Sequence, residues 1–332
     1  MARSLCGIAV ALALTTAMAE AAPIACGGSD LVQAMQAERP DHLAAMTEKA
    51  AAIPNGEGLL WRIERDGLAP SYLFGTIHFT DLRVHDFSPA VTAALDEAKA
   101  GAVESLYVLG DPLDDGPIRE AGISTFLPDG QTLADLLDAD QLAALKAGLA
   151  ARLLAYDAFK TQKPWVLMQV LSYPPCELAS LVTGSPIVDK DIALRVKAAG
   201  KPLIGLETAA EQIGSLEAVP MEAQVKLLLM AAIQSDRIED VHETMLKLYR
   251  SEKVAMIDLI GRNLAGEAFD EEAYRQFMEH LLVRRNRRML ERALPHMDKG
   301  GVFIAVGALH LPGEDGLVAL FRKAGYTVTR VE

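Results

Sequence analysis

Residues 71–78 read SYLFGTIH, and residues 302–310 read VFIAVGALH. Each stretch is an apolar, strand-like run that meets a glycine and places a histidine, His78 or His310, three residues later. In open α/β sheets, ligands bind just beyond the carboxyl ends of the strands. One Gly-x-x-His sequence occurs by chance in many chains, and a lone strand-end histidine is commonly a packing residue. Two copies in matching positions favour one shared site if the two strands are neighbours.

The glycines of the two motifs, Gly75 and Gly307, have a specific use at the end of a strand. Because glycine has no Cβ, it lets the backbone turn sharply or approach another group closely. We therefore expect both glycines to support the site without taking part in its chemistry.

The segments around the first motif predict a hairpin and then a strand, helix, strand unit. Residues 59–65 alternate as a strand, Asp66-Gly67 makes a turn, and the first motif returns as the second strand. A helix over 90–100 leads to a short strand over 101–103, which ends at Glu104. This carboxylate lies at the same edge as the first motif if the strands are parallel.

A second carboxylate follows a strand further along the chain. Residues 202–206 predict a buried strand that ends at Glu207. Each carboxylate also has a structural interpretation. Glu104 could simply be a solvated residue at a strand end. Glu207 could orient the start of the next helix, where Thr208 and Glu211 have the spacing of a capping box.

The rest of the chain is mostly helical until the second motif, which leads into a helix over 315–324 and a strand over 326–331. Strands therefore come from both ends of the chain. The sequence predicts an α/β fold, with a central mixed sheet flanked by helices and a helical insertion between the sheet halves. The expected helices cover 133–154, 165–181 with a break at Pro174-Pro175, 189–200, 221–249, 254–264 and 270–294.

The side chains at the four strand ends suit a metal site. Neutral imidazole and carboxylate oxygens bind Zn, Mn or Co, and such a metal can lower the pKa of bound water. We expect His78, His310 and Glu104 to hold a divalent cation and a carboxylate to act as general base. The chain has no His-Glu-x-x-His, Gly-x-Ser-x-Gly or Walker sequence, so a nucleotide site is not indicated.

Other charged groups receive simpler interpretations. The formal net charge of −13 argues against a nucleic-acid partner, because phosphate binding depends on Lys and Arg. Arg285-Asn286 lies in a helical pattern and, on sequence alone, is expected on a solvated face. We expect the remaining histidines to be surface or packing residues, namely His42, His85, His242, His280 and His296.

Residues 1–19 have the pattern of a signal peptide that ends in Ala-Met-Ala, so the protein is expected to be exported, to the periplasm or the medium. An N-terminal helical segment over 20–58 and an α/β domain over 59–332 would follow. Cleavage would leave Cys26 and Cys176 as the only cysteines. In an oxidising compartment they favour a disulfide, with two buried free thiols as the alternative.

The ordered motifs resemble those of the TraB/GumN family from about residue 59 to residue 331. This family is similar to the TIKI proteases, which are divalent-metal-dependent peptidases built around two Gly-x-x-His motifs and acidic residues. It also shares a broader fold with erythromycin-esterase-like and ChaN-like proteins. The resemblance rests on LFGTIH at 73–78, VES at 103–105, Val188-Asp189, GLET at 205–208 with Glu211-Gln212, Arg285-Asn286 and VGALHLPG at 306–313.

The resemblance implies a site larger than the strand-end groups. It implies that His78, His310 and Glu104 bind the metal, and that Glu104 also takes part in catalysis with Glu207, Arg285 and Asn286. Gly75, Gly307, Asp189 and Gln212 would support the site. Asp189 and the Arg285-Asn286 pair are indicated by the resemblance alone.

Three functions fit these observations. The first is an exported metal-dependent hydrolase, a peptidase acting on a peptide or small-molecule substrate, with Mn, Co or Zn as the cofactor. The second is an exported protein that binds haem or a metal without chemistry, as ChaN-like proteins bind haem. The third is a hydrolase of an ester or lactone that needs no metal.

Overall fold

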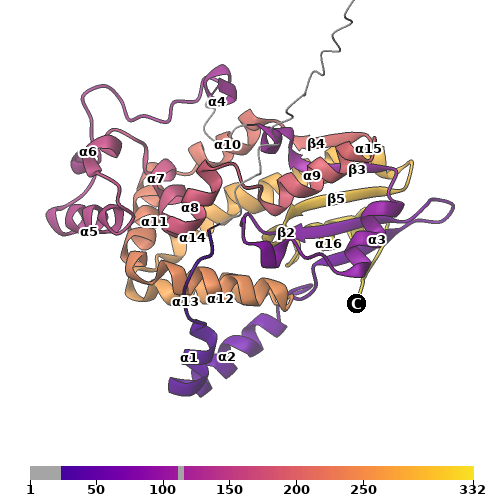
Figure 1. Ribbon diagram of the computed structural model, residues 1–332, viewed down its shortest axis with the longest axis horizontal. Coiled ribbons are helices and arrows are strands. Elements are labelled where there is room, and N and C mark those ends of the chain that lie inside the picture. The colour runs from indigo at the N-terminus through magenta and orange to yellow at the C-terminus, as the bar shows by residue number, and fades with distance from the viewer. Residues whose placement is uncertain (1–23, 111–115) are drawn as a thin grey trace, which may run out of the picture.

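A six-stranded mixed sheet forms the centre of the computed structural model, which describes residues 24–110 and 116–332 (Figure 1). The expected signal peptide at 1–19 therefore lies outside the described residues. The strand order is β4-β3-β5-β2-β1-β6, and β1 runs antiparallel to the other five strands. The predicted α/β class and hairpin are confirmed. The strands are β1 Leu60–Glu64, β2 Ser71–Thr76, β3 Ala100–Ser105, β4 Leu203–Glu207, β5 Val302–Gly307 and β6 Thr327–Arg330.

The two motif strands are neighbours in this sheet. β2 and β5 pair in parallel, with Gly75 opposite Val306 and Thr76 opposite Gly307. β3 pairs in parallel with the other side of β5, and β4 pairs in parallel with β3. The carboxyl ends of all four strands therefore meet at one edge, as the sequence predicts.

Alternating side chains of the strands form a core on each face of the sheet. Phe74, Val103 and Phe303 pack against α2, α3, α9, α12 and α13 on one face. Leu73 and Ile304 pack against α15 and α16 on the other face. The helices named so far are α2 Pro40–Ala51, α3 Pro89–Glu97, α9 Val188–Ala198, α12 Ile238–Arg250, α13 Val254–Ala265, α15 Arg284–Met297 and α16 Leu317–Lys323.

A group of helices to one side of the sheet has an apolar core of its own, formed mainly by leucines of α5, α7 and α11 (Figure 1). Its members come from the chain between β3 and β5, so the predicted helical insertion is confirmed. The remaining helices are α1 Leu31–Glu38, α4 Gly116–Glu120, α5 Ala139–Ala150, α6 Tyr156–Phe159, α7 Pro164–Leu171, α8 Pro175–Val182, α10 Ala209–Glu217, α11 Met221–Ile233 and α14 Glu271–Met278.

Several helices differ from the sequence prediction. The one expected over 221–249 is two helices, α11 and α12, separated by a 3-10 turn at Ser235–Arg237. The helix expected over 90–100 ends at Glu97, because Ala98 has an extended backbone and β3 begins at Ala100. The helix expected over 133–154 starts only at Ala139, where Asp138 forms a capping box with Gln141. The helix expected over 270–294 is interrupted by a π-helical turn, Glu279–Val283, between α14 and α15.

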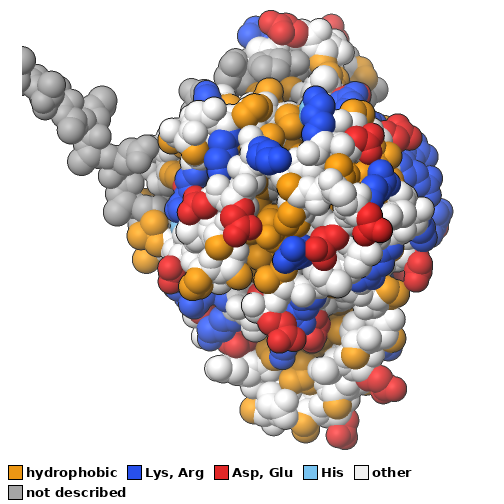
Figure 2. Space-filling view, turned by 90° about the vertical axis from the view of Figure 1, so that its right-hand side faces the viewer, with side chains coloured by type: hydrophobic (Ala, Val, Ile, Leu, Met, Phe, Trp, Pro, Cys, Tyr) orange, Lys and Arg blue, Asp and Glu red, His pale blue; other side chains and the backbone are white. Residues whose placement is uncertain are grey.

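The N-terminal segment is anchored to the helical part of the protein. Cys26 and Cys176 form a disulfide that joins residues 150 positions apart, as expected. The Ile24 backbone N–H also donates to the Ser180 hydroxyl at 2.8 Å. Among the described residues, no helix has the length and apolar character needed to cross a membrane. Figure 2 shows one face of the molecule, where acidic and basic side chains are interspersed with apolar ones.

Candidate metal centre

The sheet edge brings three of the predicted groups together. His78 follows β2 by two residues, Glu104 lies near the end of β3, and His310 ends the short 3-10 turn after β5. Glu104 is 4% exposed and His310 is 3% exposed, whereas the His78 side chain is 46% exposed. The cluster therefore has two buried members and one that faces solvent.

His78 is oriented by a buried carboxylate from the first turn of α9. The His78 Nδ1 atom lies 2.8 Å from Asp189 Oδ2, and the Thr76 hydroxyl donates to Asp189 Oδ1 at 2.7 Å. The Asp189 charge raises the pKa of His78 to about 9, so the metal-free ring is protonated at neutral pH and a bound cation would displace the proton of Nε2. With Nδ1 engaged, Nε2 is the ring nitrogen left for a ligand, the arrangement common for histidines that bind metals.

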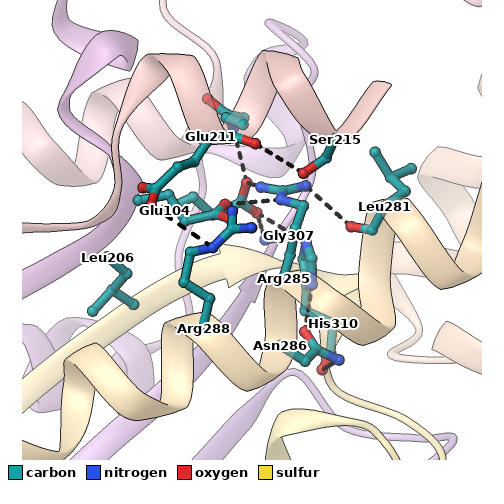
Figure 3. A network of polar contacts seen from close by, with 12 residues as sticks. Glu104, Leu206, Glu211, Ser215, Leu281, Arg285, Asn286, Arg288, Gly307 and His310 are labelled. Atoms are coloured by element: carbon teal, nitrogen blue, oxygen red, sulfur yellow. Dashed lines mark hydrogen bonds and ion pairs between the residues drawn. The ribbon is translucent and has the colours of Figure 1, made fainter. Parts of the chain in front are cut away.

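His310 is oriented by an amide in place of a carboxylate. Its Nδ1 atom lies 2.6 Å from Asn286 Oδ1 (Figure 3). Asn286 Nδ2 donates to the Asp315 carbonyl at 2.8 Å and so sets the direction of the amide. The hydrogen of the ring must therefore be on Nδ1. Burial lowers the pKa of His310 to about 3, so the ring is neutral and Nε2 carries a lone pair.

Glu104 links the two histidines to the neighbouring arginine. Its Oε1 atom accepts the Gly307 backbone N–H at 2.7 Å and lies 3.5 Å from His310 Nε2. Its Oε2 atom accepts a bond from Arg285 at 2.5 Å (Figure 3). The same oxygen accepts a bond from Gln212 at 3.1 Å. Burial alone would raise the pKa of Glu104, but the Arg285 charge and these bonds hold it well below its usual range. Glu104 is therefore ionised.

The three side chains converge beside Gly307. A Cβ placed on Gly307 would lie 3.2 Å from Glu104 Oε1, 3.5 Å from His78 Nε2 and 3.6 Å from His310 Cδ2. His78, Glu104 and Asp189 each offer a ligand atom within 4.8 Å of the others. The lone pair of His310 Nε2 meets an ionised oxygen with no proton between them. His78 and Glu104 belong to this set and His310 borders it through Glu104, so imidazole and carboxylate groups of the kind that bind a divalent cation lie together here.

Glu207 lies in the adjoining ion-pair network and not in the cluster itself. Its two oxygens accept bonds from Arg285 Nε at 2.8 Å and from Arg288 Nη1 at 2.7 Å. Thr208 and Glu211 form the predicted capping box of α10, and Glu211 also pairs with Arg292. Glu207 thus holds Arg285 against Glu104.

The solvated position expected for Arg285-Asn286 from sequence alone is wrong. Arg285 is 4% exposed and Asn286 is 2% exposed, and both side chains contact the cluster. The solvated strand end considered for Glu104 is also wrong. No sequence pattern indicated a role for Thr76 or Arg288, which bind Asp189 and Glu207 through contacts distant in sequence. Among the other histidines, His85 pairs with Asp191 and His242 is buried against Glu177.

The convergence of these side chains beside Gly307 leads to a testable prediction. Gly307→Ala would place a methyl group among His78, Glu104 and His310 without a backbone penalty, because the φ angle here, −51°, suits any residue. We expect about tenfold weaker binding of Co²⁺ with little change in thermal stability. Competition with a coloured chelator would measure the affinity. Unchanged affinity would show that a cation does not occupy this space.

Comparisons with known proteins place the chain among metalloprotease-like relatives. The model of the TraB/PrgY/gumN family matches residues 59–330. Metalloprotease TIKI1 of Homo sapiens is 25% identical over 319 residues, covering 81% of this chain and 61% of the relative. Metalloprotease TIKI1 of Danio rerio is 23% identical over 318 residues, with 81% and 62% covered.

A third relative is a bacterial protein of similar size. The uncharacterized protein YbaP of Shigella flexneri is 25% identical over 258 residues, covering 76% of this chain and 88% of the relative. This chain spans about three fifths of the length of the TIKI1 relatives, at 61% and 62%. No solved structure matches the chain.

Proposed function

The chain belongs to the TraB/PrgY/gumN family, and from this membership and the geometry beside Gly307 we propose that it is a metal-dependent hydrolase acting on peptides. One observation carries the proposal. Glu104 Oε1, His78 Nε2 and the edge of the His310 ring converge beside Gly307, and each histidine is fixed through its Nδ1 atom. The TIKI relatives carry the name metalloprotease, which supports the choice of a peptide substrate.

His78, His310 and Glu104 would hold the cation. A bound divalent cation lowers the pKa of water and polarises a carbonyl oxygen. Asp189 and Asn286 would keep the two rings in the tautomer that presents Nε2. Since the side chain of His78 is 46% exposed, the open side of the site is the one at which a substrate would enter.

The neighbouring charges would tune the site. Three carboxylates face three positive groups. Arg285 and Arg288 pair with Glu104 and Glu207, and protonated His78 pairs with Asp189, so a bound cation would take over the charge of the His78 proton. Glu207 would act through Arg285, because both of its oxygens are taken by arginines. Glu104 is then the strand-end carboxylate that contacts the reacting groups.

The remaining proposals concern the cellular location of the protein and the division of its chain into parts. The disulfide is typical of proteins in an oxidising compartment, which supports export by the expected signal peptide at 1–19. We propose that residues 20–58 form an N-terminal segment attached to the α/β domain at 59–332. The family match over 59–330 supports this division.

The test is the metal content and peptidase activity of the purified chain. We expect close to one metal ion per chain by elemental mass spectrometry after loading with Mn²⁺, Co²⁺ or Zn²⁺. Cleavage of a mixed peptide library should stop on addition of a chelator and return when metal is restored.

Two results would contradict the proposal. The first is an absence of bound metal after loading, with a visible absorption band on adding haem, which would identify a haem-binding protein. The second is hydrolysis of esters or lactones that resists the chelator, which would identify a metal-independent enzyme.

A further inference from the structure

The segment that carries His78 leaves the sheet before it reaches the histidine. The last paired residue of β2 is Thr76, opposite Gly307. Thr80, two residues beyond His78, is 1% exposed and is held by one carboxylate oxygen. Glu177 Oε2 accepts the Thr80 backbone N–H at 2.9 Å and the Thr80 hydroxyl at 2.7 Å. Glu177 thus fixes the far end of the segment 77–80.

Glu177 is itself firmly placed. It lies in the first turn of α8, directly after Cys176, whose disulfide to Cys26 anchors this turn to the N-terminal segment. Its other oxygen, Oε1, lies 3.0 Å from His242 Nε2 on α12. Burial opposes ionisation of Glu177, but the bonds from His242 and Thr80 outweigh it and lower its pKa.

The same group also contacts the residue between His78 and Thr80. The His242 ring packs against the Phe79 ring, with their centroids 4.3 Å apart. Glu177 is 1% exposed and His242 is 2% exposed, so neither faces solvent. The His78 segment is therefore held at Thr76 by the sheet, at Phe79 by His242 and at Thr80 by Glu177.

We propose that Glu177 is a positioning residue that fixes the backbone of the segment 77–80 and thereby strengthens metal binding by His78. The second part rests on the proposed function. Asp189 orients the His78 ring through Nδ1, but the placement of Nε2 also depends on where the backbone holds the ring. Because the ring is partly exposed, few packing contacts substitute for the bonds of Glu177. Ligand geometry must be held within a fraction of an ångström for tight binding.

The experiment compares Glu177→Leu with Glu177→Gln and with a matched control. Glu217→Leu removes a carboxylate away from the His78 segment, which is partly buried and contacts Lys163 and the Trp165 indole. Two properties are measured in each variant. The first is hydrogen exchange of the amides 77–80 without metal, and the second is the dissociation constant for Co²⁺.

We expect Glu177→Leu to speed exchange at 77–80 and to weaken Co²⁺ binding, each by about tenfold. Glu177→Gln should keep the exchange rate at 77–80 and the Co²⁺ affinity close to those of the wild type. Its amide oxygen still accepts from Thr80, and its amide nitrogen donates to the other tautomer of His242. Glu217→Leu should lower thermal stability without changing either property at the site.

The two readouts separate this inference from the proposed function. Unchanged exchange at 77–80 in Glu177→Leu, or an equal change in Glu217→Leu, would overturn the positioning role. Faster exchange with an unchanged dissociation constant for Co²⁺ would overturn the link to metal affinity. Faster exchange in a protein whose wild type binds no divalent metal would support the positioning role and refute the proposed function.

Discussion

Replacing Arg285 with leucine is expected to lower the free energy of unfolding by about 3 to 5 kcal/mol. Arg285 is 4% exposed and bridges Glu104 and Glu207, which are 4% and 3% exposed. Its loss leaves two buried carboxylates near each other, and of their remaining partners only Arg288 carries a full positive charge, because Glu104 keeps the Gly307 N–H and Gln212. An uncompensated buried charge costs more than the ion pair itself contributes.

Chemical denaturation of the chain at neutral pH would measure this loss. Arg287→Leu is the matched control, because Arg287 lies on the same helix but is 59% exposed and pairs with Asp315 at the surface. An exposed pair contributes about 0 to 1 kcal/mol. Equal losses in the two variants would show that Arg285 is not the counter-charge of the buried carboxylates.

The Arg285→Leu defect should also depend on pH. In the wild type, Arg285 helps keep the pKa of Glu104 below its ordinary 4.5, so this pair stabilises the fold above that pH. In the variant the carboxyl groups become easier to protonate, and protonation removes their unpaired charge. The difference in unfolding free energy between the two proteins is therefore expected to shrink as the pH falls toward 4.5.

The sheet edge of the site could be predicted from the sequence because the signal is local. Each Gly-x-x-His motif follows an apolar run, and Glu104 and Glu207 each end one. Parallel strands place such ends together whatever the intervening chain does. The length of the insertion between β3 and β5 therefore did not weaken the prediction.

The spacing of the apolar residues on α15 indicates that Arg285 is buried, but the charged residues beside it hide this pattern. Met289, Ala293 and Met297 are buried on α15 at intervals of four residues, and one further step back along this row reaches Arg285. The neighbouring exposed arginines made the stretch resemble a solvated face. In addition, the π-helical turn Glu279–Val283 changes the helical phase, so the pattern of α14 does not continue into α15.

The partners that orient the histidines could not be derived from the residues alone. Asp189 meets His78 across 111 residues, and no local pattern relates them. Asn286 meets His310 across 24 residues through the packing of α15 on the sheet. Both were indicated only by the family resemblance, since side-chain contacts of this kind arise from tertiary packing. Neither the residue pattern nor the family resemblance indicated a role for Thr76 or Arg288.

Removal of either motif histidine is expected to have the largest effect on the site itself. His78→Ala and His310→Ala should each weaken Co²⁺ or Zn²⁺ binding by more than about 100-fold, because each removes a ligand and not merely the group that orients it. Peptidase activity should fall with metal occupancy. His85→Ala is the matched control, since His85 also pairs with an aspartate of α9 but lies outside the cluster.

The double variant decides whether the two histidines share one ion. If they hold the same cation, either single substitution already empties the site. The double variant, His78→Ala with His310→Ala, should then bind the same small amount of metal as each single variant. Such non-additivity is the signature of groups that act as one unit. If each single variant instead keeps half of the bound metal and the double variant loses all of it, the histidines belong to separate sites. That result would refute the shared centre beside Gly307, although both motifs end at the same edge of the sheet.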